Sequence, residues 1–195
     1  MAGQAVDLPG ACLAFDPDWL GAGEAWALFE ALHAQLPWER HRITVYGRTL
    51  DAPRLSCWIG DAAYTYSGTR FDPHPWPGAL ADVRARLERE LHAGFNSVLA
   101  NLYRDGRDSM GWHSDDEPEL GVQPVIASLS LGATRRFVLK HRSDPSRKVA
   151  LELPRGSLLL MRGATQANYR HALPRTAKPV GPRINLTFRR ITTPG

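Results

Sequence analysis

The chain has 195 residues, of which 43% are hydrophobic and 23% are charged. These values exclude an intrinsically disordered chain and predict one soluble domain, most simply a monomer, that buries its own hydrophobic core. The net charge of +4 permits contact with phosphates but does not demonstrate it. No apolar run reaches the length of a membrane span, and residues 1–10 lack the features of a secretory signal, so we expect a cytoplasmic protein.

The first helix is predicted between Asp16 and Pro37. Asp16-Pro17 resembles an N-cap followed by proline at the first helical position, and apolar residues then recur at helical spacing from Trp19 to Leu36. The stretch from 42 to 66 mixes β-branched and aromatic residues with turn residues, which predicts short strands and a hairpin with Tyr46-Gly47 near its tip.

A second helix is predicted from Pro77 to Gly94. Its apolar positions form one stripe, made of Leu80, Val83, Leu87 and Leu91. This pattern indicates an amphipathic helix with a charged outer face.

The second half of the chain is predicted to consist of strands. They span 96–103, 125–131, 136–140, 149–153, 157–161 and 184–188. Six short strands without helices between them indicate an antiparallel sandwich or jelly roll. The predicted fold class is therefore mainly β with flanking helices (α+β), organised as a single domain over 1–195 in which 1–95 precede a jelly-roll core at 96–191.

Two residues following the first long strand could hold a metal ion. His113 and Asp115 stand two apart, so in extended backbone their side chains leave on the same face. A third ligand must come from elsewhere, and two histidines with one carboxylate are the ligand set of non-haem Fe(II) oxygenases. We rank His171, just before the last strand, above the other candidates, which are His33, His41, His74, His92 and His141.

The last strand alternates polar and apolar residues. Alternation places Arg183, Asn185, Thr187 and Arg189 on one face. Asn101 and Tyr103 form a second polar pair at the same spacing, so the two strands could line a cavity that binds a small dianion. The alternative is an edge strand whose polar face lies in water.

A basic segment at 140–148 is predicted to be a connecting loop. It carries Lys140, Arg142, Arg147 and Lys148, which would contact phosphates and supply sequence-independent affinity if the loop lies near the site. A solvated hairpin loop explains the same charges equally well.

These residues together resemble one family. The matching motifs, in chain order, are Asn101-x-Tyr103, Gly106, His113-x-Asp115-Asp116-Glu117, His171 and Arg183-x-Asn185-x-Thr187-x-Arg189. They resemble the AlkB family of Fe(II)- and 2-oxoglutarate-dependent nucleic-acid dealkylases, in the branch that contains the human nuclear DNA-repair members. The resemblance extends from about Ile43 to Ile191 and leaves the first forty residues uncovered.

The resemblance implies a double-stranded β-helix, a jelly roll, preceded by an N-terminal helix and nucleotide-recognition hairpins. It implies that His113, Asp115 and His171 are the catalytic ligands of Fe(II). The residues implied to bind the cosubstrate 2-oxoglutarate are Asn101, Tyr103, Arg183, Asn185, Thr187 and Arg189. Among these, Asn185 and Thr187 would support the pocket.

The resemblance also implies a substrate pocket made of Tyr46, Tyr64, Tyr66, Asp116 and Glu117. Tyr66 would stack on a flipped base, and Tyr46 would fill the gap that the base leaves. Without the resemblance, the tyrosines are equally explained by strand packing and the glutamate by an ordinary loop.

The implied function is oxidative demethylation of N-alkylated bases, such as 1-methyladenine and 3-methylcytosine, in DNA or possibly RNA as the nucleic-acid partner. The reaction would consume O2 and 2-oxoglutarate and release formaldehyde, succinate and CO2. Two alternatives stay open: a related oxygenase that acts on RNA, a protein or a small molecule, and a non-catalytic nucleic-acid-binding protein.

Overall fold

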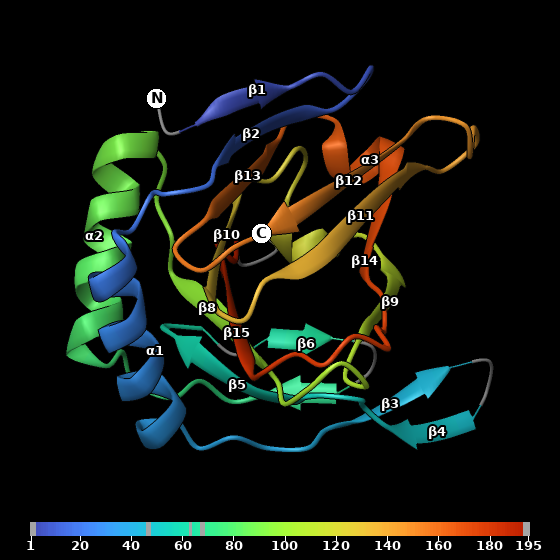
Figure 1. The fold of residues 1–195 in the computed structure, drawn as a ribbon. Helices are drawn as coiled ribbons and strands as arrows, with labels where there is room; N and C mark the ends of the chain where they lie inside the picture. Colours follow the sequence, from blue (N-terminus) through green and yellow to red (C-terminus); the bar gives the residue numbers. More distant parts are fainter. Residues whose placement is uncertain (1–2, 46–47, 63, 67–68, 193–195) are drawn as a thin grey trace.

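The larger sheet of the fold is antiparallel throughout and contains seven strands (Figure 1). The structure, a computed structural model, describes residues 3–45, 48–62, 64–66 and 69–192, with the backbone alone described within 43–48 and 64–71. In spatial order the strands are β1 (Gln4–Val6), β2 (Cys12–Asp16), β13 (Leu158–Arg162), β10 (Ile126–Gly132), β15 (Arg183–Arg189), β8 (Ser97–Tyr103) and β5 (Leu55–Gly60).

Two helices cover the outer face of this sheet and lie side by side in Figure 1: α1 (Ala22–Gln35) and α2 (Gly78–Leu91). Their apolar stripes form one core with the sheet, in which Leu32, Leu87 and Leu186 are each at most 1% exposed. Burying a leucine side chain contributes about 1.5–3 kcal/mol, so this helix layer holds the larger sheet firmly in place. No helix in the described ranges is long and apolar enough to cross a membrane.

The smaller sheet faces the other side of the larger one. Its four antiparallel strands are, in order, β12 (Lys148–Leu153), β11 (Arg135–His141), β14 (Tyr169–Leu173) and β9 (Met110–His113). A second core fills the space between the sheets and includes Ile126 and Leu159 from one sheet and Leu139 from the other. Two antiparallel sheets packed face to face, with helices on one outer side, confirm the predicted β-rich jelly-roll class.

The shorter elements connect these layers. They are the hairpin of β3 (Arg42–Val45) and β4 (Arg48–Asp51), the hairpin of β6 (Tyr64–Tyr66) and β7 (Thr69–Phe71), the 3-10 turn η1 (Pro118–Leu120) and the one-turn helix α3 (Thr165–Asn168). The division of the chain at residue 95 stays a prediction, although β1, β2 and β5 are hydrogen-bonded within the same sheet as strands from the second half.

The second helix, with its buried stripe from Leu80 to Leu91, and the six predicted strands agree with the structure, which has two further strands in the second half, β9 and β14. The predicted start of the first helix, at Asp16-Pro17, was wrong. Cys12–Asp16 pairs with β13, so Asp16 ends a strand, and the helix begins only after Gly21. Trp19 therefore precedes the helix. This long-range strand pairing outweighs the local capping signal.

The elements around His171 were not predicted from the sequence. Thr165–Asn168 forms a helical turn, and Tyr169–Leu173 forms strand β14. The strand exists because Leu139 and its neighbours on β11 pair with it in register. The sequence signal was weak because polar residues occupy its outward-facing positions.

Candidate metal and cosubstrate site

A small cavity of about 40 Å³, open to solvent at its mouth, lies between the two sheets. Its polar lining comes from Asn101, Tyr103, His113, Asp115, Ser128, His171, Arg183, Asn185, Thr187 and Arg189, and its apolar lining from Met110, Phe137, Met161 and Leu173. All nine residues that the sequence analysis assigned to iron and 2-oxoglutarate therefore lie in one cavity.

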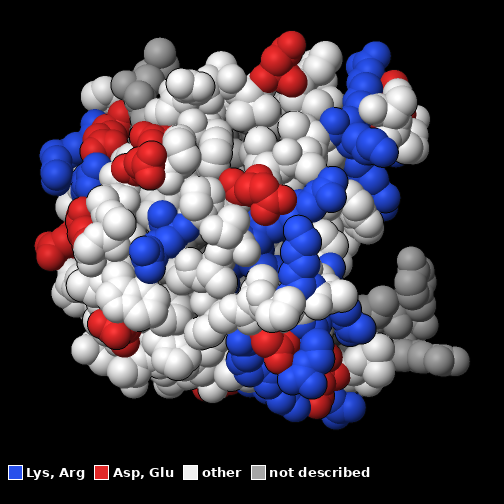
Figure 2. Space-filling model, viewed as in Figure 1, with Lys and Arg blue, Asp and Glu red and all other residues white. Residues whose placement is uncertain are grey.

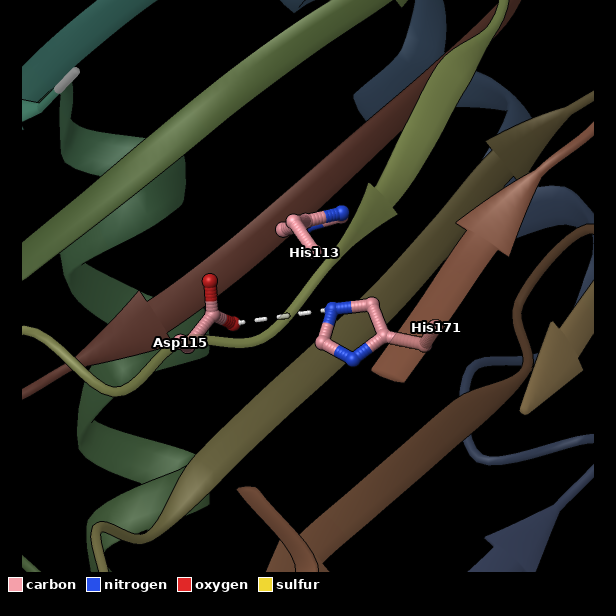
Figure 3. Close-up of side chains that lie close together, drawn as sticks. All are labelled: His113, Asp115 and His171. Carbon is pink, nitrogen blue, oxygen red and sulfur yellow. Dashed lines mark ion pairs between the residues drawn. The ribbon is translucent and has the colours of Figure 1, made fainter. Parts of the chain in front are cut away.

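The two histidines and the aspartate point toward one another at one end of this cavity (Figure 3). His113 ends strand β9, Asp115 follows it by two residues, and His171 stands opposite His113 in the register of β14. Their ligand atoms all lie within 4.8 Å of one another, and Asp115 Oδ2 lies 4.0 Å from His171 Nε2. Strand pairing thus brings together three groups that could share one ion.

The protonation of these side chains suits a cation. Burial, helped by the nearby His113, lowers the pKa of His171 to about 3, and burial also lowers the pKa of His113. Burial alone would raise the pKa of Asp115, but Arg189 and the two histidines outweigh it and lower that pKa. At neutral pH the site therefore holds two neutral imidazoles and one carboxylate, the forms in which these side chains bind metals.

Hydrogen bonds orient two of the ligands. His113 Nδ1 lies 2.8 Å from Gly111 O, which assigns the proton to Nδ1 and leaves the Nε2 lone pair for a metal. Arg189 Nη2 donates to Asp115 Oδ1 at 2.7 Å, which leaves Oδ2 facing His171. Two imidazoles and one oriented carboxylate match the facial triad of non-haem iron sites, so the residues present fit Fe(II).

The backbone that carries Asp115 is held from outside the triad. The Asp115 N–H donates to Gln166 Oε1 at 2.9 Å, and Gln166 is 2% exposed. Ser114 Oγ donates to Tyr169 O at 2.8 Å. Arg142 donates to Ser114 Oγ, to Gln166 O and to the carboxylate of Asp116. These contacts fix the ligand loop in position, as outer partners of metal ligands generally do.

The other end of the cavity contains a buried cation. Arg183 is 1% exposed, and burial lowers its pKa to about 10, so the guanidinium is charged at neutral pH. Its Nη2 donates to Ser130 Oγ at 2.9 Å and to Asn185 Oδ1 at 2.8 Å. Nε and Nη1 have no hydrogen-bond partner among the described residues. Unsatisfied buried donors of a charged group are costly, which favours an anionic ligand at this end.

The polar neighbours of Arg183 are themselves fixed in place. Asn185 Nδ2 donates to Thr187 Oγ1 at 2.8 Å, and the guanidinium carbon of Arg183 lies 5.4 Å from the centre of the Tyr103 ring. On the adjoining strand, Arg54 Nε donates to Asn101 Oδ1 at 2.9 Å. That bond uses the Asn101 oxygen as an acceptor, so the NH₂ group is the donor that the same amide can offer to a ligand.

The implied substrate residues are described only in part. Asp116 is exposed and binds Arg142, and Glu117 is half-buried immediately before η1. Tyr46 lies outside the described residues. Tyr64 and Tyr66 lie on β6, where only the backbone is described.

The sequence analysis missed three residues that support the site. Arg54 orients Asn101, Gln166 holds the backbone of Asp115, and Arg142, whose contact with phosphates stays a prediction, binds the ligand loop. Arg54 lies within the stretch that resembles the family, which begins at about Ile43, and this could have pointed to it. Gln166 carried no sequence signal, because its role depends on the unexpected turn of α3.

The comparisons with known proteins identify the family. The model of the 2OG-Fe(II) oxygenase superfamily matches residues 13–189. The alpha-ketoglutarate-dependent dioxygenase alkB homolog 3 is 41% identical to this chain in Bos taurus and 40% identical in Homo sapiens, over 90% of this chain and 64% of each relative. The chain thus spans just under two thirds of the length of these relatives. The DNA oxidative demethylase ALKBH2 of Homo sapiens is 40% identical over 88% of this chain and 70% of its own length.

Solved structures support the fold. The structure of OsALKBH1 matches with a TM-score of 0.69 at 17% identity, covering 96% of this chain and all of that one. A Pseudomonas putida prolyl-4-hydroxylase matches with a TM-score of 0.57 at 19% identity, covering 91% and 92%. From the family match, the identity to curated relatives and the geometry of the triad, the chain belongs to the AlkB family of Fe(II)- and 2-oxoglutarate-dependent dioxygenases, with His113, Asp115 and His171 as its iron-binding triad.

Proposed function

We propose that this protein is an oxidative demethylase that removes alkyl groups from N-alkylated bases in DNA, such as 1-methyladenine and 3-methylcytosine. The observation that carries the proposal is that the metal triad and the partly unsatisfied guanidinium of Arg183 line one cavity. The relatives named DNA oxidative demethylase support the choice of substrate. The cytoplasmic location and the monomeric state stay predictions.

In this proposal the far end of the cavity binds the distal carboxylate of 2-oxoglutarate. Arg183 offers Nε and Nη1 to that carboxylate, and its Nη2 stays bound to Ser130 and Asn185, which fixes the plane of the guanidinium. Tyr103 and the amide of Asn101 line the same cavity. Thr187 supports the pocket through Asn185.

At the metal end, Arg189 holds the carboxylate of Asp115 in its binding orientation while His113 and His171 present neutral imidazoles. Iron, when bound, supplies the oxidation in which one oxygen atom of O2 enters succinate as CO2 leaves, and the other hydroxylates the N-alkyl carbon, which departs as formaldehyde. The chain contributes orientation and a cavity whose apolar wall, including Phe137 and Leu173, limits competing oxidation.

The substrate residues belong to the same proposal. Tyr66 would stack on the flipped base, with Tyr64, Asp116 and Glu117 around the base and Tyr46 in the gap left in the strand. The contact between Asp116 and Arg142 would then place the hairpin of β11 and β12 beside the base.

The test is turnover with Fe(II), ascorbate and 2-oxoglutarate on methylated single-stranded DNA, duplex DNA and RNA of one sequence. We expect formaldehyde and succinate in equal amounts with methylated DNA, and little succinate with the unmethylated oligonucleotide. His113→Ala should abolish both products, while His33→Ala, which removes an exposed histidine on α1, should leave them unchanged. Turnover on RNA alone, or none on any methylated nucleic acid, would contradict the proposal.

A further inference from the structure

Trp112 is an exposed tryptophan next to a metal ligand. It stands on β9 immediately before His113, its residue is 45% exposed, and Lys140 Nζ lies 4.0 Å from the centre of its ring. Single exposed aromatic residues are common and need no explanation by themselves. The charges around this one make it different.

Three cations lie in a row across the smaller sheet beside Trp112. Lys140 on β11 is directly opposite Lys148 on β12 and directly opposite Arg170 on β14. Residues that face each other across strands project from the same side of the sheet, with about 5 Å between strands, and like charges in this arrangement repel. No carboxylate within the described ranges lies within ion-pair distance of any of the three. The row therefore has an uncompensated positive charge.

The cations at the tip of the same hairpin differ from those of the row, because they have acidic partners. Arg142 binds Asp116, and Arg147 lies 3.0 Å from Asp144, so both cations at the tip already have acidic partners. Figure 2 shows Lys and Arg side chains gathered on the side of the molecule where Figure 1 places β11 and β12. The cations free to hold a polyanion are thus those of the sheet face rather than those of the loop tip.

The row also lies beside the metal triad. β9 is an edge strand of the smaller sheet and pairs with β14. Trp112 immediately precedes His113 on β9, and Arg170 immediately precedes His171 on β14. A single strand whose target base reaches the triad could therefore also contact Trp112 and Arg170.

We propose that Trp112, Lys140, Lys148 and Arg170 form a contact surface for a single-stranded stretch of nucleic acid beside the target nucleotide, with Trp112 stacked on an unpaired base and the three cations on phosphates. This inference rests on the proposed function. Aromatic platforms combined with a basic track bind single strands without sequence preference. In a duplex both faces of each base are covered by neighbouring base pairs, so Trp112 gains a stacking partner only on unpaired nucleotides.

The experiment measures the binding of a fluorescein-labelled, unmethylated 12-nucleotide DNA by anisotropy, using protein loaded with Mn²⁺ and 2-oxoglutarate. Trp112→Ala should weaken single-strand binding about tenfold, given the usual strength of base stacking. Trp112→Phe keeps a ring and should stay within about threefold of the wild type. Replacing Lys140, Lys148 and Arg170 together with Gln should reduce the slope of log Kd against log salt concentration by about two.

Trp26 provides a matched control. It is 44% exposed and has Arg155 5.3 Å from its ring centre, but it stands on α1, on the far side of the larger sheet. Trp26→Ala should leave DNA binding unchanged. Unaltered melting temperature and Mn²⁺ affinity in Trp112→Ala would show that the neighbouring ligand His113 is undisturbed.

The outcomes separate this inference from the proposed function. If Trp112→Ala binds single strands like Trp26→Ala, or loses duplex affinity as strongly as single-strand affinity, the contact surface is wrong even if the wild type demethylates DNA. If Trp112→Ala selectively loses single-strand affinity while the wild type releases no formaldehyde from any methylated oligonucleotide, the contact surface stands and the demethylase function is wrong.

Discussion

The two ends of the cavity differ in how their polar groups are satisfied. At the metal end, Asp115 already receives a hydrogen bond from Arg189, and His113 donates to Gly111 O. At the far end, Arg183 is fully buried and keeps two donor atoms without a partner among the described residues. The first end is complete except for a cation, and the second is complete except for an anion. A metal ion at the first end, together with a dicarboxylate such as 2-oxoglutarate that reaches from this ion to Arg183, satisfies both.

The largest effect is expected at the metal end. Asp115→Ala removes a ligand and leaves Arg189 without its buried carboxylate, so we expect Mn²⁺ affinity to fall more than about 100-fold and turnover to disappear. Asp116→Ala, one residue further on and exposed, is the matched control and should keep Mn²⁺ affinity within about threefold. Calorimetric Mn²⁺ titration distinguishes them, and equal affinity in the two variants would rule out the triad.

The next effect concerns the anion end. Arg183→Gln should raise the KM for 2-oxoglutarate about 100-fold, because losing one partner of a buried, hydrogen-bonded charge pair costs about 2–5 kcal/mol. Arg183→Lys keeps the charge but not the paired donors, so its KM for 2-oxoglutarate should lie between those of the wild type and Arg183→Gln. Mn²⁺ affinity should be unchanged in both variants. If KM stayed at the wild-type value, the cosubstrate would bind elsewhere.

The metal-free protein should lose stability in acid because of His171. Its pKa is about 3 in the folded chain and about 6.5 in an unfolded one, so between these two pH values mainly the unfolded state binds the proton. The free energy of unfolding should therefore fall as the pH drops from about 6.5 toward 3, by up to ~1.4 kcal/mol per pH unit for this group. Urea unfolding at pH 7, 6 and 5 should show that the free energy of unfolding falls less steeply with decreasing pH in His171→Gln than in the wild type. An identical pH dependence in the two proteins would mean that His171 is not held neutral.

The smallest effect is expected at Arg142. Arg142→Gln removes the contacts to Asp116, Ser114 Oγ and Gln166 O and should weaken Mn²⁺ binding by about threefold to tenfold, because outer partners of a metal site tune its affinity. Arg147→Gln, on the same hairpin but paired only with Asp144, should have no effect on Mn²⁺ affinity. If Arg142→Gln and Arg147→Gln bound Mn²⁺ with equal affinity, the contacts of Arg142 would not contribute to the metal site.

The sequence was sufficient for the parts of the site that depend on periodicity. Alternation along the last strand placed Arg183 and Arg189 on one face, and both line the cavity. The two arginines are six positions apart on the strand, and the structure shows that Arg189 contacts Asp115. His171 was ranked correctly as the third ligand even though its strand was not recognised.

The parts that could not be predicted depend on contacts between distant residues. Gln166 holds Asp115 across 51 positions, and Arg54 orients Asn101 across 47. Neither contact leaves a local pattern, because each requires a turn or strand whose position is set by the packed sheets. The start of α1 was missed for the same reason, since the pairing of β2 with β13 is a property of the whole fold.

The most direct test of the account is the thermodynamic coupling between the two ends of the cavity. If one 2-oxoglutarate molecule spans from Arg183 to the metal, Mn²⁺ must raise the affinity for 2-oxoglutarate, and 2-oxoglutarate must raise the affinity for Mn²⁺ by the same factor. Calorimetric titration of each ligand with and without the other measures both factors. We predict equal factors of about tenfold or more in the wild type and a loss of this coupling in Arg183→Gln. An affinity for 2-oxoglutarate that is the same with and without Mn²⁺ would contradict the account.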